Sequence, residues 1–251
     1  MESIGVFHFD RLFHRYTQPY VTVMSITAED VIPENFSGIV PLFPLPNLVM
    51  FPGVVQPLQI FESRYKAMMK WTLKHERLIA MAILKPEWET DQGSPPIHPV
   101  VCIGKVIAHT KLEDGRYKLL LMGGKRAFIE NELSAPQPFR TAQVTLMNDV
   151  SQDDHDGNRR EVLSRKFLHY LRNTLPPNEQ LDELLRKRVS LGLLTDIVAS
   201  VLDLPPERKY ELLEQTNTNR RAEMLISELV AHADNSTPVK AHGFPPNFSA
   251  N

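Results

Sequence analysis

Residues 39–62 read IVPLFPLPNLVMFPGVVQPLQIFE, and this stretch decides the fold of the first half of the chain. It carries no charge before its final glutamate, yet it contains five prolines. Each proline removes a backbone donor, and a helix in lipid could not satisfy so many missing hydrogen bonds. Short apolar runs that proline and glycine interrupt are typical of strands and tight connections in a buried β layer. We therefore predict strands at 39–44 and 54–60, followed by an amphipathic helix at 62–75.

The composition is that of an ordinary globular protein. The chain has 251 residues, of which 42% are hydrophobic and 23% charged, and its net charge is -2. This balance gives no general electrostatic reason to expect nucleic acid or anionic lipid as a partner. A single cysteine excludes an internal disulfide and a cysteine-rich zinc site. Charged residues interrupt the N-terminus, and no apolar run reaches the ~20 residues of a spanning helix, so we predict a cytoplasmic protein.

The rest of the first half predicts a compact, mainly antiparallel sheet or a partly closed barrel. Asp114-Gly115 is typical of a hairpin turn, because glycine accepts a positive φ without a clash. Gly123-Gly124 is interpreted as a turn that breaks a strand. The further predicted strands are 78–84, 100–109, 117–122, 126–130 and 142–146.

The pattern changes from strands to helices after Ser151. A polar hinge at 152–158 precedes apolar residues at helical spacing, which predict helices at 159–175, 181–189, 194–202, 205–214 and 218–233. The sequence therefore predicts an α+β protein with four segments. They are a partly disordered leader (1–35), a β-rich subdomain (36–150), an α-helical subdomain (151–233) and a disordered tail (234–251). Met24 is an alternative candidate start.

No motif indicates catalysis, a cofactor or a metal. Gly104-Lys105 and Gly124-Lys125 lack the other residues of a phosphate loop, and His75-Glu76 lacks the second histidine of a zinc-protease helix. The acidic run at 153–156 is out of register with a calcium loop and is interpreted as a linker. Cys102 lies in an apolar run, which favours a buried, inert thiol. We expect no enzymatic activity.

Basic pairs occur in the helical half, but glutamates dilute their charge. We interpret them as solvated helix surface rather than as a nucleic-acid patch. These pairs and triplets are Arg159-Arg160, Arg165-Lys166, Arg186-Lys187-Arg188 and Arg220-Arg221.

Residues 40–53 (VPLFPLPNLVMFPG) closely resemble the opening of the Lon protease N-terminal domain. Further motifs that match this family follow in its order. They are Pro57-Leu58, Phe61-Glu62, Arg64-Tyr65, 103–107 (IGKVI), 114–117 (DGRY), Gly123 with Arg126, 196–204 (DIVASVLDL), 209–214 and Asn219-Arg220. The resemblance covers about residues 39–232.

The resemblance implies a PUA-like pseudo-barrel followed by an α-helical bundle, and a role in substrate recognition and assembly. The 251 residues leave no room for the ATPase and Ser-Lys peptidase modules of Lon proteases, so we expect a stand-alone, non-catalytic module. Its expected partners are unfolded or client polypeptides and an ATP-dependent protease, without nucleic acid or membrane.

Client binding would use apolar contacts along a groove or an exposed strand edge. Candidate contact residues are Phe43, Leu45, Phe51 and Phe61, although such residues more often belong to a core. Two alternatives remain open. An ATP-independent peptidase or other hydrolase would need a nucleophile that the motifs do not supply. An RNA-binding PUA-like protein would need more positive charge than this chain carries.

Overall fold

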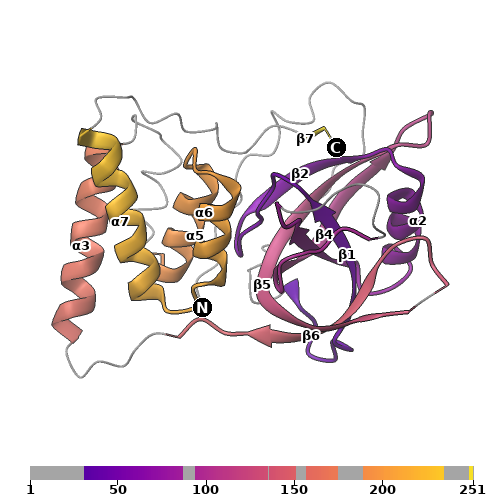
Figure 1. Ribbon diagram of the computed structural model, residues 1–251, viewed down its shortest axis with the longest axis horizontal. Helices are drawn as coiled ribbons and strands as arrows, with labels where there is room; N and C mark the ends of the chain where they lie inside the picture. The colour runs from indigo at the N-terminus through magenta and orange to yellow at the C-terminus, as the bar shows by residue number, and fades with distance from the viewer. Residues whose placement is uncertain are drawn as a thin grey trace.

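The computed structural model describes residues 31–86, 94–134, 136–150, 157–174, 189–234 and 249–250. Strands gather at one end of the molecule together with one helix, α2, and the other helices lie at the opposite end (Figure 1). In chain order the elements are β1 (Ile39–Leu45), β2 (Val55–Ile60), α2 (Ser63–Thr72), β3 (Leu78–Ile83), β4 (Val100–Lys111), β5 (Tyr117–Leu133), β6 (Thr141–Met147), α3 (Gly157–Thr174), α5 (Leu191–Val201), α6 (Pro206–Glu214), α7 (Thr218–Asp234) and β7 (Ser249–Ala250). The predicted α+β class is confirmed.

The sheet closes into a ring of five strands. Its order is β4-β3-β1-β6-β5-β2-β7, and β4 also pairs with β5, so that β4, β3, β1, β6 and β5 follow one another around a barrel. The β1–β3 and β2–β7 pairs are parallel, and the other pairs are antiparallel. The ring removes most free strand edges, and β2 continues the sheet outside it. The predicted antiparallel, partly closed barrel is therefore confirmed.

Alternate residues of the ring strands enter two separate apolar clusters. In β1, Val40 and Leu42 join one cluster, while Phe43 and Leu45 join the other. The first cluster takes side chains from all five ring strands, and many of them are alanine or valine. Small side chains suit the interior of a narrow barrel. The second cluster contains the larger side chains and continues into α2 and the helical half, so it lies on the outer surface of the ring.

The prediction of a turn at Gly123-Gly124 is wrong, because both glycines lie inside β5. This strand runs unbroken for 17 residues, where two strands were predicted. A Cβ on Gly123 would lie 2.1 Å from the Phe51 carbonyl oxygen, and one on Gly124 would lie 2.5 Å from Val31 Cγ1. Between Ile103 and Gly104 the β4–β5 register shifts by one residue, which marks a β-bulge at Gly124. The glycines therefore permit close packing along a bent strand.

Some predicted segments fall outside the described residues. These are most of the leader, most of the 152–158 hinge, nearly all of the helix predicted at 181–189, and tail residues 235–248. Ser249 and Ala250, which were predicted to be part of a disordered tail, form β7 beside β2. The other predicted helices and strands agree with the observed ones to within a few residues, apart from β5.

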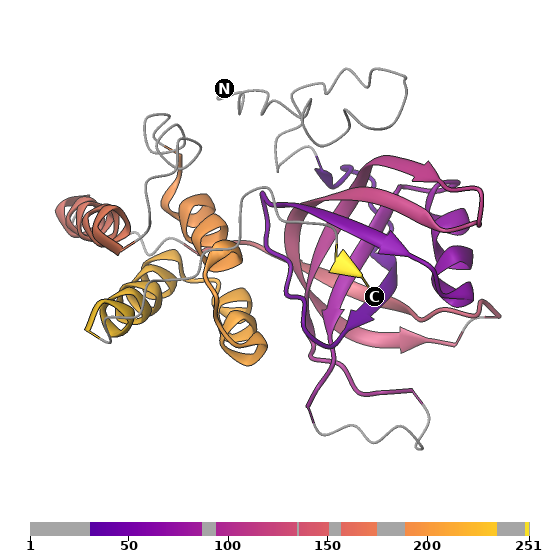
Figure 2. The ribbon, with the colours of Figure 1, turned by 90° about the horizontal axis from the view of Figure 1, so that it is seen from above.

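In the helical half, helices that the apolar periodicity predicted pack against one another. Helices α3 and α7 lie side by side, and α5 and α6 lie between them and the barrel (Figures 1 and 2). Phe167 and Leu171 of α3 and Leu225 and Leu229 of α7 are fully buried in the large cluster. The Ser190 hydroxyl accepts a hydrogen bond from the Leu193 amide and caps α5.

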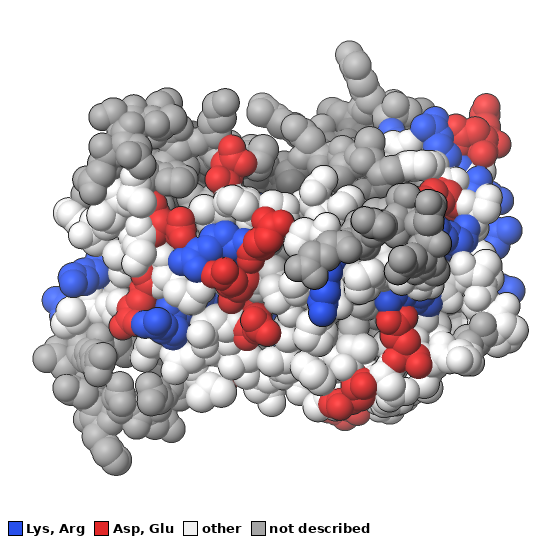
Figure 3. Space-filling model, in the orientation of Figure 1, with Lys and Arg blue, Asp and Glu red and all other residues white. Residues whose placement is uncertain are grey.

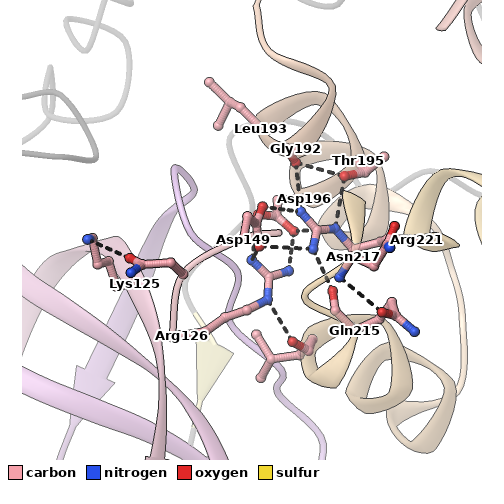
Figure 4. Close-up of polar contacts among 12 residues, drawn as sticks. Lys125, Arg126, Asp149, Gly192, Leu193, Thr195, Asp196, Gln215, Asn217 and Arg221 are labelled. Carbon is pink, nitrogen blue, oxygen red and sulfur yellow. Dashed lines mark hydrogen bonds and ion pairs between the residues drawn. The ribbon is translucent and has the colours of Figure 1, made fainter. Parts of the chain in front are cut away.

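Arg126 of β5 extends out of the barrel into the helical half, where its guanidinium is almost fully buried (Figure 4). Two of its nitrogens donate to the Asp196 carboxylate of α5 at 2.5 and 3.0 Å. Its Nε donates to the Leu213 carbonyl of α6 at 2.6 Å, and Nη1 lies 3.3 Å from Asp149 Oδ1. One side chain therefore connects the barrel to two helices and to the segment that follows β6.

Arg221 of α7 completes the cluster from the opposite side (Figure 4). Its guanidinium donates to Asp149 Oδ2 at 2.6 Å, to the Thr195 hydroxyl at 2.9 Å and to the Gln215 carbonyl at 2.6 Å. Its Nε also lies 3.3 Å from Asp196 Oδ1. We call Arg126, Asp149, Asp196 and Arg221 the junction cluster.

The prediction that the Arg220-Arg221 pair is solvated is wrong for Arg221, which is fully buried, and Arg220 alone is exposed. Two arginines can be buried here because two aspartates pair with them. Burial by itself lowers the pKa of Arg126, but the Asp196 and Asp149 carboxylates outweigh it and the pKa lies above its ordinary value. The guanidinium therefore stays charged, and removing one carboxylate would leave buried positive charge without a partner.

We expect Asp196→Asn to destabilise the fold by about 3–5 kcal/mol, because it leaves the Arg126 guanidinium buried without its main counter-charge. Urea unfolding measured by circular dichroism gives the free energy. The control is Asp114→Asn, which removes a solvent-exposed ion pair with Arg116 and should have a much smaller effect on the free energy of unfolding. Equal effects of the two substitutions would contradict a structural role for the junction cluster.

We expect Gly123→Ala to cost at least about 2 kcal/mol, since its methyl group would meet the fixed Phe51 carbonyl rather than a flexible side chain. The same unfolding measurement tests this. Gly115→Asn is the control, because that hairpin position has open space and a positive φ that asparagine tolerates. A Gly123→Ala protein as stable as the control would show that β5 can move away from Phe51.

Candidate functional site

The structure separates the four candidate contact residues into two groups. Phe43 and Phe51 are fully buried and Leu45 is 4% exposed, all within the large outer cluster. The Phe43 ring packs against the Tyr65 ring of α2 with centroids 4.6 Å apart. Phe61 is 42% exposed. In this conformation a bound polypeptide could reach only Phe61, and its role as a contact remains a prediction.

Phe61 lies between β2 and α2, directly after the last residue of the strand. Glu62 and Arg64 follow it in the chain and form an ion pair of 2.8 Å at the surface. The Arg64 guanidinium also lies over the Tyr65 ring, 5.2 Å from its centroid. The hydrogen bond that Arg64 donates to the Glu62 carboxylate raises the pKa of Arg64, so this group is a fixed positive charge close in sequence to the exposed Phe61 ring. An exposed ring beside a charged pair suits contact with a partner of mixed polarity.

β2 is attached to the ring on one side only. It pairs along all six of its residues with the first half of β5, from Val55↔Met122 to Ile60↔Tyr117. On its other side only Leu58 and Gln59 pair, in parallel, with Ser249 and Ala250 of β7. Figures 1 and 2 both show β7 beside β2. Among the described residues, the remaining outer edge of β2 has no strand partner.

The side chains that anchor β2 keep this edge in place. Leu58 and Ile60 are buried in the large outer cluster, whereas Val55 and Gln59 are half-buried. Pro57 lacks an N–H and is tolerated because the strand lies at an edge. Sequence reasoning identified β2 as a strand, but it could not identify an edge, because neighbours in the sheet depend on tertiary pairing.

Cys102, the single cysteine, is fully buried, as predicted. Burial raises the pKa of its thiol to about 12, so it is protonated at neutral pH. His75, considered above as a metal ligand, lies at the exposed end of α2 and stacks on Trp71 with ring centroids 3.9 Å apart. Within the part of the chain that is described, no three His, Cys, Asp or Glu residues form a metal-binding group.

Acidic and basic side chains lie next to one another on the face shown in Figure 3. One set of such pairs joins Arg208 to Glu211 and, at 2.5 Å, to Glu228. Such pairing leaves a mixed electrostatic surface rather than a basic stripe. No helix among the described residues has the length and apolar character needed to cross a membrane.

Curated relatives match most of this chain but only a part of their own length. The chain is 26% identical to the Lon protease of Anaeromyxobacter dehalogenans over 198 residues, which are 78% of this chain and 23% of that protein. It is 25% identical to Lon protease 2 of Myxococcus xanthus, again over 78% of this chain and 24% of the relative. The chain thus spans about a quarter of the length of these relatives.

Solved structures show the same fold. The N-terminal domain of the Mycobacterium avium complex Lon protease superposes with a TM-score of 0.60 at 18% identity, covering 77% of this chain and 99% of that one. A Lon N-terminal domain protein from Xanthomonas campestris gives a TM-score of 0.52 at 19% identity, with 75% and 97% covered. The family model of the ATP-dependent protease La (LON) substrate-binding domain matches residues 39–231. The chain therefore belongs to the LON substrate-binding domain family.

Proposed function

We propose that this protein is a non-catalytic module that recognises polypeptide substrates. The observation that carries this proposal is the family match over residues 39–231, which includes both the barrel and the helical half. The family is described by substrate binding, and the substrates of proteases are polypeptides. The edge of β2 and the exposed Phe61 ring supply the kinds of group that bind extended chains, namely backbone donors and acceptors beside an apolar side chain.

The buried, protonated thiol of Cys102 supports binding without catalysis. A thiol with a pKa of about 12 in the core is neither ionised nor reachable by a substrate. The buried charged groups of the junction cluster pair with one another, and the Asp196 carboxylate is out of reach of a substrate. A hydrolase would instead need a nucleophile and a base that meet at an accessible position.

An ATP-dependent protease is the second partner that we propose. The curated relatives are Lon proteases about four times longer than the part they share with this chain. A recognised substrate is degraded only where the recognition module contacts an unfolding and cleaving machine. A pull-down from the source cell, followed by mass spectrometry, would identify that machine.

Binding to a labelled, reduced and carboxymethylated lactalbumin tests the main proposal. We expect saturable binding with a Kd of about 1–100 μM by fluorescence anisotropy, in the range of weak recognition modules. Native lactalbumin is the control and should bind at least about tenfold more weakly, because its backbone groups are already paired. Casein should remain intact in the same preparation.

Two results would overturn the proposal. One is the absence of saturable binding to the unfolded probe. The other is casein turnover that a single Ser, His or Cys substitution abolishes, which would establish the peptidase alternative.

A further inference from the structure

The outer edge of β2 carries backbone groups that can pair with another strand. An edge strand presents a row of N–H and C=O groups on its free side, and proteins use such rows to bind extended segments. Here β7 covers only the Leu58 and Gln59 positions of a six-residue strand. On the described part of the chain, the positions from Val55 to Pro57 face no strand on that side.

The chain itself shows which kind of segment fits this edge. Ser249 and Ala250 lie along β2 in the parallel direction, with Ser249 opposite Leu58 and Ala250 opposite Gln59. They come from a part of the sequence nearly 200 residues away, so the pairing is tertiary and depends on no hairpin turn. An extended backbone that runs parallel to β2 is therefore compatible with the surface around this edge.

We propose that the outer edge of β2 is the docking strand for an extended client segment, which binds parallel to β2 and displaces Ser249–Ala250. This inference rests on the proposed function and adds its site, the direction of the bound chain and an internal competitor. Pro57 offers a partner no N–H, and its carbonyl accepts from the Gln56 side-chain amide. A client segment that pairs with Val55 as well as at Leu58 and Gln59 still forms more backbone hydrogen bonds than the two residues of β7. It can therefore replace β7 although both use the same positions.

Phe61 lies where a docked client would extend beyond the position of β7. In parallel pairing, each step of one residue along β2 corresponds to a step of one residue along the bound strand. Gln59 is opposite Ala250, and Phe61 lies two residues after Gln59. A client that continues two residues beyond the position of Ala250 thus comes level with the exposed Phe61 ring. Backbone pairing tolerates many sequences, while Phe61 favours an apolar client residue at this point.

The anchoring of β2 makes the edge a rigid template. Its other side is paired with β5 throughout, and Leu58 and Ile60 are held in the core. The backbone groups therefore keep their spacing before a client arrives, which reduces the entropy that binding must overcome.

The first experiment tests the internal competitor with the full chain and the same labelled unfolded lactalbumin. The double substitution Ser249→Pro with Ala250→Pro removes both β7 amide donors, whereas Ser249→Ala keeps them. We expect the proline variant to bind the probe roughly fivefold more tightly, the equivalent of about one net backbone hydrogen bond. The alanine control should bind like the unmodified protein. Unchanged affinity of the proline variant would overturn the competition between β7 and the client.

The second experiment tests the site itself. Phe61→Ala is compared with Phe128→Ala, because the two phenylalanines are 42% and 41% exposed and lie on different parts of the barrel. We expect Phe61→Ala to weaken probe binding about tenfold or more, as for an aromatic contact residue, and Phe128→Ala to leave it unchanged. In the unmodified protein the probe should also slow amide hydrogen exchange in residues 54–61 but not in β6.

The outcomes separate this inference from the proposed function. If the unmodified protein binds the probe but Phe61→Ala has no larger effect than Phe128→Ala, or the amides of β2 gain no protection, the β2 site is wrong while polypeptide recognition stands. If the unmodified protein does not bind the probe at all, the proposed function fails and the β2 site fails with it.

Discussion

The junction cluster is the interaction on which the arrangement of the two halves depends. The Arg126 side chain extends from the barrel and the Arg221 side chain from α7. Both pair with the carboxylates of Asp149 and Asp196 in a largely buried site. Buried ion pairs stabilise little over an apolar core, but they tolerate little displacement, because a separated charge in such a site is costly. The cluster therefore sets how the helices lie on the barrel, while apolar packing supplies most of the stability.

The pairing of β5 places β2 at an edge of the sheet. Its second half closes the ring with β4 and β6, and its first half continues outside the ring to pair with β2. The bulge and the two glycines at 123–124 allow this bend and bring the backbone near Phe51. A strand without them would collide with the 50–54 segment. The edge of β2 that no other described strand completes is thus a consequence of how the ring is closed.

The proline-rich stretch at 39–62 contributes more to the fold than to binding. Phe43, Leu45 and Phe51 contribute to the core that joins α2, β2 and the helices. Of the four candidate contact residues, Phe61 alone is exposed. The residues that identify the family here are therefore largely core residues. The recognition surface that we propose consists instead of backbone groups of β2 and the exposed Phe61 side chain.

The sequence by itself determined the α+β class, the change from strands to helices near residue 150, the buried thiol and the family. These follow from local periodicity, turn residues and an ordered set of motifs. Three features depended on the tertiary structure. A glycine pair in a sequence is equally compatible with a turn and with a strand that another segment approaches closely. The sequence alone therefore suggested a turn at Gly123-Gly124, where the structure has a continuous strand. Arg221 looks solvated because its carboxylate partners, Asp149 and Asp196, lie far away in the sequence. The sequence did not show that β2 is an edge strand. A strand is an edge when one of its sides lacks a full partner, and its partners β5 and β7 lie far from it in the sequence.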